Sequence, residues 1–70
     1  MKRQELLSLL MELEELRIQK RLISDRIARA RAAGDLSSNI EYQNAKEEEQ
    51  RIYNRITEIE QMIADAERGI

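Results

Sequence analysis

The segment from Gly34 to Tyr42, G-D-L-S-S-N-I-E-Y, is the stretch of this sequence whose residue types best suit chemistry. It supplies two carboxylates, Asp35 and Glu41, and carboxylate oxygens are ligands that Mg²⁺ prefers. A site with so few protein ligands needs water or a substrate phosphate to complete the metal shell. The alternative is that both acids cap a helix, because the dipole of a helix favours negative charge at its N-terminus.

Composition excludes most other chemistry. The chain has no Cys and no His, which excludes disulfides, Cys/His zinc sites and the usual Cys or His nucleophiles and bases. A glycine-rich phosphate loop is also excluded, since glycine occurs only at Gly34 and Gly69. The apolar runs are far shorter than a membrane span and no signal peptide is visible. We therefore expect a soluble cytoplasmic protein with no membrane partner.

The elements that position the Gly34–Tyr42 segment are predicted to be two long helices. Charged residues make up 37% of the chain and proline is absent, a composition typical of a coiled coil. Apolar residues recur at alternating steps of three and four, which is a heptad seam. The seam positions are Leu6, Leu9, Leu13, Leu16, Ile23, Ile27, Ala30, Tyr42, Ala45, Ile52, Ile56, Ile59, Ile63, Ala66 and Ile70.

This pattern predicts an all-α fold, a single antiparallel two-helix coiled-coil hairpin over residues 1–70. We expect one helix over about 3–33, a turn over about 34–38 and a second helix over about 39–68. Gly34 suits the left-handed position just after the first helix. The residues from Ser38 to Glu41 form a capping box for the second helix, although Asp35 or Ser37 could cap it instead.

The register of the hairpin follows from folding the chain at Leu36, because seam residues whose numbers add up to 72 then lie opposite each other. The two polar interruptions, Lys20 and Glu49, fall in adjacent layers and could form a diagonal ion pair. Residues 1–34 carry a net charge of +3 and residues 35–70 a net charge of −5. Opposite charges on the two halves favour their pairing.

Leu7, Leu10 and Met11 lie off the seam near the open end of the hairpin, with Tyr53 and Met62 on the other arm. Two helices cannot cover all of these side chains, and such a surplus marks a contact surface. The contact could be self-association into a four-helix bundle, with a homodimer through the open end, or docking on a second domain or another protein. The remaining alternative is that these side chains are simply exposed.

The run from Ala30 to Gln50 resembles the tip of the N-terminal coiled coil of the Gre family of bacterial transcript-cleavage factors. The family pattern around the turn is close to G-D-L-S-E-N-A-E-Y, against G-D-L-S-S-N-I-E-Y here. Heptad periodicity alone does not generate this motif, so the resemblance is specific. Flanking residues in the same register, including Arg55 and Ile56, extend it over most of the chain.

The resemblance implies a mechanism. In the family the hairpin enters the secondary channel of RNA polymerase, and its tip acids help to hold the second catalytic Mg²⁺ while the polymerase hydrolyses the 3′ end of backtracked RNA. The partners would be bacterial RNA polymerase and, indirectly, the nascent RNA 3′ end. The chain would not be an enzyme and would have no cofactor of its own. It would at most donate a carboxylate to the Mg²⁺ of the polymerase.

The resemblance also assigns residues. Asp35 matches the essential tip aspartate that shares the Mg²⁺, and Glu41 is the second candidate carboxylate of this tip. Residues expected to contact RNA or polymerase are Arg31, Leu36, Ser37, Ser38, Asn39 and Lys46. Residues 17–31 carry six cations and one acid, which also suits an acidic channel or RNA, or simply a solvated helix face.

Two departures from the family pattern affect the expected function. Ser38 stands where the family has a second tip glutamate, and a hydroxyl is a neutral, weak Mg²⁺ ligand. The chain also stops about where the family's globular C-terminal domain would begin. We therefore expect a secondary-channel binder whose stimulation of cleavage is weakened or replaced by inhibition. The alternative is a structural coiled-coil oligomerisation module with no polymerase activity. A nucleic-acid binder is disfavoured by the pI of about 5.2 and the scarcity of aromatic residues.

Overall fold

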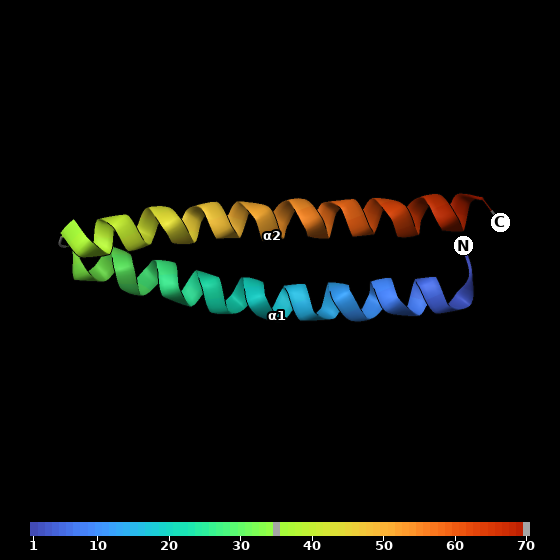
Figure 1. Cartoon of the computed structure of the whole chain (residues 1–70), viewed down its shortest axis with the longest axis horizontal. Helices are drawn as coiled ribbons and strands as arrows, with labels where there is room; N and C mark the ends of the chain where they lie inside the picture. Colours follow the sequence, from blue (N-terminus) through green and yellow to red (C-terminus); the bar gives the residue numbers. More distant parts are fainter. Residues whose placement is uncertain (35, 70) are drawn as a thin grey trace.

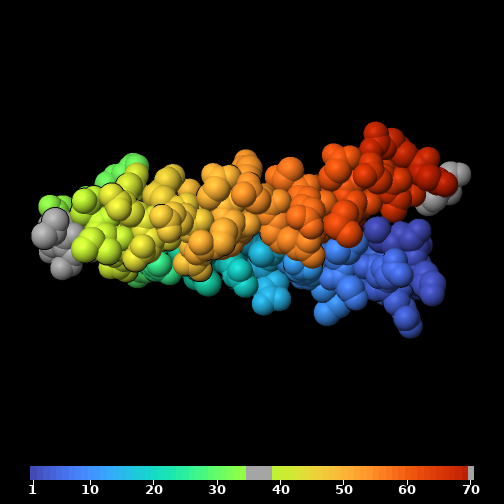
Figure 2. Space-filling model, turned by 45° about the horizontal axis from the view of Figure 1, so that its top comes forward, coloured from blue at the N-terminus to red at the C-terminus, as the bar shows by residue number. Residues whose placement is uncertain are grey.

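The chain forms a hairpin of two antiparallel helices, which confirms the predicted fold class. The computed structural model describes the backbone of residues 1–34 and 36–69 and the side chains of residues 1–34 and 39–69. Helix α1 spans Arg3–Ala33 and helix α2 spans Leu36–Arg68. The helices lie side by side along their whole length, with both termini at one end and the turn at the other (Figure 1). The resulting rod measures 52 × 15 × 12 Å (Figure 2).

One line of apolar side chains between the helices makes up the core. Every buried hydrophobic residue that the structure describes is a predicted seam position, and Ala45 and Ile59 are fully inaccessible to solvent. Burial of apolar surface is the main force that holds the two helices together, because neither helix has another layer to pack against. The buried residues are Leu13, Ile23, Ile27, Ala30, Ala45, Ile52 and Ile59.

Ion pairs cross between the helices on both sides of the seam. Arg55 donates two hydrogen bonds to Glu12, with Nε–Oε2 and Nη2–Oε1 distances of 2.7 and 3.0 Å. This bidentate contact lowers the pKa of the Glu12 carboxyl below its ordinary value. Arg17 pairs with Glu60 on the other side of the seam at 3.7 Å. The residue numbers of these two pairs add up to 67 and 77, five below and five above the predicted register of 72.

The two polar residues of the seam do not pair with each other as expected. The Nζ atom of Lys20 lies 4.7 Å from the centroid of the Tyr53 ring, a cation–π contact. Glu49 instead accepts a hydrogen bond of 3.0 Å from Lys46, three residues earlier on the same helix. The contact of Lys20 reaches across to α2, whereas that of Glu49 stays within its own helix, so each polar group has a partner without the diagonal pair.

The turn is tighter than predicted. Gly34 has φ 68° and ψ 11°, the left-handed conformation expected of it, and it ends α1. Helix α2 then begins at Leu36 rather than near residue 39. Ser38 is therefore inside the helix instead of at the capping position that the capping box requires. Asp35, one of the alternative capping residues considered above, lies outside the described residues.

Neither described helix contains an apolar window long enough to cross a membrane.

The core predicts a clear difference between buried and exposed isoleucines. We expect Ile59→Ala to lower the free energy of unfolding by about 2–4 kcal/mol, because it removes a fully buried side chain that no other layer can replace. Ile40→Ala, at a position that is 59% exposed, should change stability by less than about 0.5 kcal/mol. Urea unfolding followed by circular dichroism measures both. Equal losses in the two variants would contradict the assignment of the core.

Candidate functional site at the tip of the hairpin

The described part of the tip comprises the last turn of α1 and the first turns of α2. Asp35, the candidate metal ligand, lies outside the described residues, and the structure describes only the backbone of Leu36, Ser37 and Ser38. Asn39 is exposed at the start of α2. Three candidate residues, Arg31, Glu41 and Lys46, have described side chains, and they show how charge is distributed around the tip.

Arg31 and Lys46 lie on one side of the hairpin, on either side of Tyr42. The guanidinium of Arg31 donates a hydrogen bond of 3.2 Å to the Tyr42 hydroxyl and lies 5.6 Å from the centroid of its ring. The ring of Tyr42 is half-buried against the core cluster. Tyr42 therefore anchors an exposed arginine to the interior of the rod. The sequence placed Tyr42 only in the seam, because its spacing says nothing about the contact of its hydroxyl.

The charges around Tyr42 shift its titration. The hydrogen bond and positive charge of Arg31 lower the pKa of the Tyr42 hydroxyl, and the positive charge of Lys46 acts in the same direction. The hydrogen bond with Glu49 and its negative charge raise the pKa of Lys46. Both cations therefore stay charged at neutral pH. Each also keeps N–H groups that these contacts do not use, since an arginine has five donors and a lysine has three.

Glu41 lies on the other side of the hairpin from Arg31 and Lys46. Its carboxylate is 4.0 Å from the Nε atom of Arg26, which also donates a hydrogen bond of 3.3 Å from Nη1 to Glu48. Arg26 and Glu41 line a groove of about 420 Å³ together with Arg29, Ala30 and Ala33. The Glu41 carboxylate thus lies at ion-pair distance from Arg26 without a hydrogen bond to its Nε atom, and its side chain is 59% exposed.

The structure therefore does not gather the described candidate residues into one constellation. Arg31 and Lys46 form one group with Tyr42, and Glu41 forms another with Arg26 and Glu48. Among the described residues, no cluster of three or more His, Cys, Asp or Glu side chains could hold a metal ion. A role for Glu41 as a metal ligand would require its carboxylate to leave Arg26.

Most cations of the basic stretch over residues 17–31 contact side chains of the second helix, and two of them, Arg17 and Arg26, pair with acids there. Four of its six cations contact acidic or aromatic side chains of α2: Arg17 with Glu60, Lys20 with Tyr53, Arg26 with Glu41 and Glu48, and Arg31 with Tyr42. The signal for this pairing was the opposite net charge of the two halves of the chain. These side chains line the sides of the rod rather than forming an unpaired basic face.

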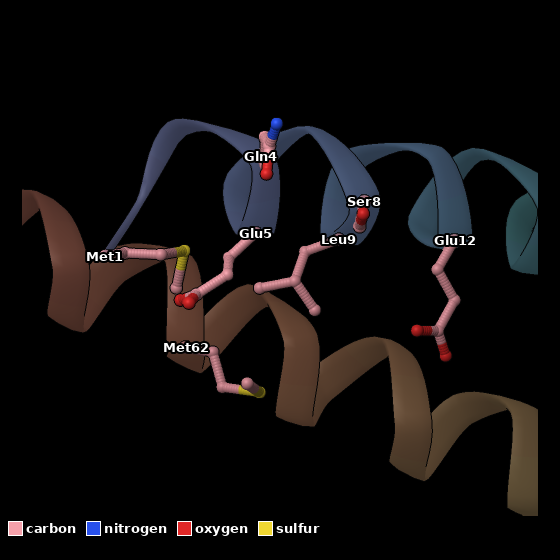
Figure 3. Close-up of a pocket in the computed structure, with 7 residues that line it drawn as sticks. All are labelled: Met1, Gln4, Glu5, Ser8, Leu9, Glu12 and Met62. Carbon is pink, nitrogen blue, oxygen red and sulfur yellow. The ribbon is translucent and has the colours of Figure 1, made fainter.

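The open end, opposite the tip, has a separate apolar groove of about 400 Å³. Leu9 projects from α1 toward α2 there, and α2 contributes Met62 to the lining (Figure 3). Leu7, Leu10 and Met11 are exposed near this end, as the sequence predicted, to 50%, 44% and 73%. The groove is lined by Met1, Gln4, Glu5, Ser8, Leu9, Glu12 and Met62.

Comparison with known proteins gives a consistent family. Residues 1–67 match the family described as the N-terminal domain of transcription elongation factors, which comprises GreA and GreB. The chain is 53% identical over 57 residues to the transcription elongation factor GreA of Thermotoga neapolitana, which covers 80% of this chain and 36% of the relative. Identity to GreA of Halalkalibacterium halodurans is 49% over 57 residues, with the same coverage of both chains.

GreA of Thermotoga maritima is 56% identical over 45 residues, which covers 64% of this chain and 29% of the relative. The chain thus spans about a third of the length of the curated relatives that it matches. No solved structure matches the chain at a comparable level.

The contact between Arg31 and Tyr42 can be tested by titration. In a Tyr53→Phe background Tyr42 is the only tyrosine, and we expect adding Arg31→Gln to raise the midpoint of its ionisation. The reason is that Arg31 favours the charged phenolate form of Tyr42. The contact between Arg31 and Tyr42 therefore stabilises the folded chain more as the pH rises through the lowered pKa of Tyr42. Ultraviolet absorbance measures the midpoint. In the same background Lys20→Gln removes a cation beside position 53 and should leave the midpoint of Tyr42 unchanged. Equal midpoints with and without Arg31 would disprove the contact.

Proposed function

The chain belongs to the family of GreA and GreB N-terminal domains, and we propose from this membership that it binds in the secondary channel of bacterial RNA polymerase. The observation that carries the proposal is the family match over residues 1–67, which includes the whole turn. The shape of the rod supports it, because its cross-section is that of a single pair of packed helices. A body this narrow and 52 Å long suits insertion into a channel.

In the proposed role the polymerase performs the chemistry and the chain supplies a ligand. The carboxylate of Asp35 would take a place in the shell of the polymerase's Mg²⁺, the kind of oxygen ligand that this ion takes alongside water and phosphate. The chain would need no cofactor of its own and would not itself be an enzyme. A cytoplasmic location follows from the proposed partner.

We infer that stimulation of RNA cleavage is weak, or replaced by inhibition, because of Ser38. A serine hydroxyl brings no negative charge to the metal, whereas the glutamate of the family pattern would bring one. Glu41 is poorly placed to substitute, because its carboxylate faces Arg26 on the side of the rod. A chain that occupies the channel without a complete set of ligands would compete with active Gre factors.

Contacts with RNA and polymerase would surround the tip. Arg31 and Lys46 both keep free N–H donors for phosphate oxygens of the extruded RNA. Since both lie on the Tyr42 side, we propose that the RNA passes on this side and not along the side of Glu41. Leu36, Ser37, Ser38 and Asn39 would contact the walls near the active site of the polymerase.

Substitutions at the tip test the proposal. With a stalled, backtracked elongation complex, we expect the wild-type chain to bind polymerase and to slow cleavage by a full-length Gre factor. Ser38→Glu should raise the chain's own stimulation of cleavage by about tenfold or more, the effect expected of a restored group at a metal site. Adding Asp35→Ala to Ser38→Glu should abolish this gain. Release of labelled RNA fragments measures each rate.

The matched control is Asn54→Glu, which adds the same charge to an exposed position of α2 far from the tip and should not stimulate cleavage. Failure to bind polymerase at micromolar concentration would remove the proposal. Strong cleavage by the wild-type chain that is lost in Asp35→Ala would keep the partner but would disprove the role given to Ser38.

A second function, a structural coiled-coil oligomerisation module, is favoured by the exposed Leu7, Leu10 and Met11 at the open end. These side chains would be covered in a homodimer or a larger assembly. Sedimentation of the purified chain should then show a stable assembly that Leu7→Glu with Leu10→Glu dissociates, and polymerase should not bind. A monomer at every concentration would disprove this alternative.

A further inference from the structure

The outer faces of the two helices differ in character. On the side of α1 that faces away from the seam, four large apolar side chains are exposed to between 45% and 73%. They are Leu7, Met11, Ile18 and Leu22, separated by steps of four, seven and four residues. At 100° per residue these steps keep all four within about 60° of one another, a single stripe along the helix. We call these four residues the outer stripe.

Beyond the exposed Ile40 in its first turns, the equivalent face of α2 is polar. Glu47, Asn54 and Gln61 occupy it at intervals of seven residues, and all three are exposed. Its amides bond along their own helix, from Gln50 to Asn54 at 2.9 Å and from Gln61 to Asp65 at 3.0 Å. The solvated face of a coiled coil has this character, whereas a continuous stripe of Leu, Ile and Met indicates a contact surface. The outer stripe extends well beyond the open end, where the sequence had indicated a surplus of apolar residues.

We propose that the outer stripe is the contact surface for a second copy of this chain, with the two α1 helices antiparallel. The steps of four, seven and four read the same in both directions, so a two-fold axis at the middle of the stripe places Leu7 against Leu22 of the second copy. The same axis places Met11 against Ile18 of the second copy. Every member of the stripe then has an apolar partner, as an isologous interface requires. A contact with an unrelated protein would not need this symmetry.

The charges beside the stripe make the association weak. Glu14 and Glu15 are exposed on either side of its middle, so the two-fold axis brings four carboxylates close together. Like charges directly opposite each other are destabilising. The stripe is also short, because its sixteen residues span only about 22 Å of helix, which places the buried area at the low end of protein interfaces. These two glutamates therefore set the strength of the dimer.

Sedimentation of the purified chain, from micromolar to millimolar concentration, tests the proposal without polymerase. We expect weak dimerisation of the wild type, and Glu14→Gln with Glu15→Gln should tighten it by about tenfold or more. Glu47→Gln with Glu67→Gln, which removes the same charge from α2, should not tighten it. Met11→Glu with Ile18→Glu should abolish the dimer, while circular dichroism shows that the helices are retained.

Disulfide trapping tests the antiparallel arrangement, since the chain has no cysteine of its own. In an oxidised mixture of the Leu7→Cys and Leu22→Cys variants, mixed dimers should form faster than either homodimer, because a disulfide needs Cα atoms within about 7 Å. Homodimers of Leu7→Cys as the main product would overturn the proposal. So would a Glu14→Gln, Glu15→Gln variant that stays monomeric, or dissociation by Leu10→Glu but not by Ile18→Glu, which would place the contact at the open end.

Discussion

A single line of interlocked apolar side chains between α1 and α2 is the constraint on which the rest of this molecule depends. With only two helices, each buried residue has one opposing element and no third layer. Most residues of this line are Leu or Ile, with Ala30 and Ala45 near the tip, and Ala45 and Ile59 leave no accessible surface at all. A helix pair of this size buries little other apolar surface, so these contacts alone fix how the two helices are aligned. That alignment in turn determines where the tip lies.

The two sides of the rod give the tip two different electrostatic environments. On one side Arg31 and Lys46 place positive charge around a tyrosine that is anchored in the core. On the other, Arg26 holds two glutamates of α2. Exposed ion pairs of this kind contribute little stability individually, so their main effect is on where charge is presented. A ligand that approaches the tip therefore meets one cationic side and one nearly neutralised side.

The fold was predictable from the sequence because its main determinant is periodic. Steps of three and four identified the seam, which burial confirms, and the ion pairs of Glu12 with Arg55 and of Arg17 with Glu60 lie evenly about the register expected from the fold at Leu36. The partners of polar side chains were not predictable in the same way. Lys20 and Glu49 each have several partners within reach, and the choice among them depends on rotamers that spacing does not encode. The start of α2 was placed too late because the capping signal of Ser38 competes with residues just before it.

At the candidate site, sequence reasoning located the tip but not its division into two sides. The motif around Gly34 identified the turn, and the left-handed glycine is where the sequence required it. Glu41 and Lys46 are separated because their heptad positions lie on opposite edges of α2. The linear sequence motif does not show on which edge each residue lies. The outer stripe was only partly recognised, because Ile18 and Leu22 are far along the chain from the cluster near the N-terminus.

The length of the rod converts a small change in its orientation into a large displacement of the turn. Its two ends are 52 Å apart, so a tilt of about 1° at the open end displaces the turn by about 1 Å, a misplacement that can cost a catalytic site about a hundredfold in rate. Angular stiffness near the termini thus matters as much to positioning as the residues of the turn itself. The groove beside Met62 lies at this end of the rod. Substitutions there would alter the aim of the distant turn without touching it.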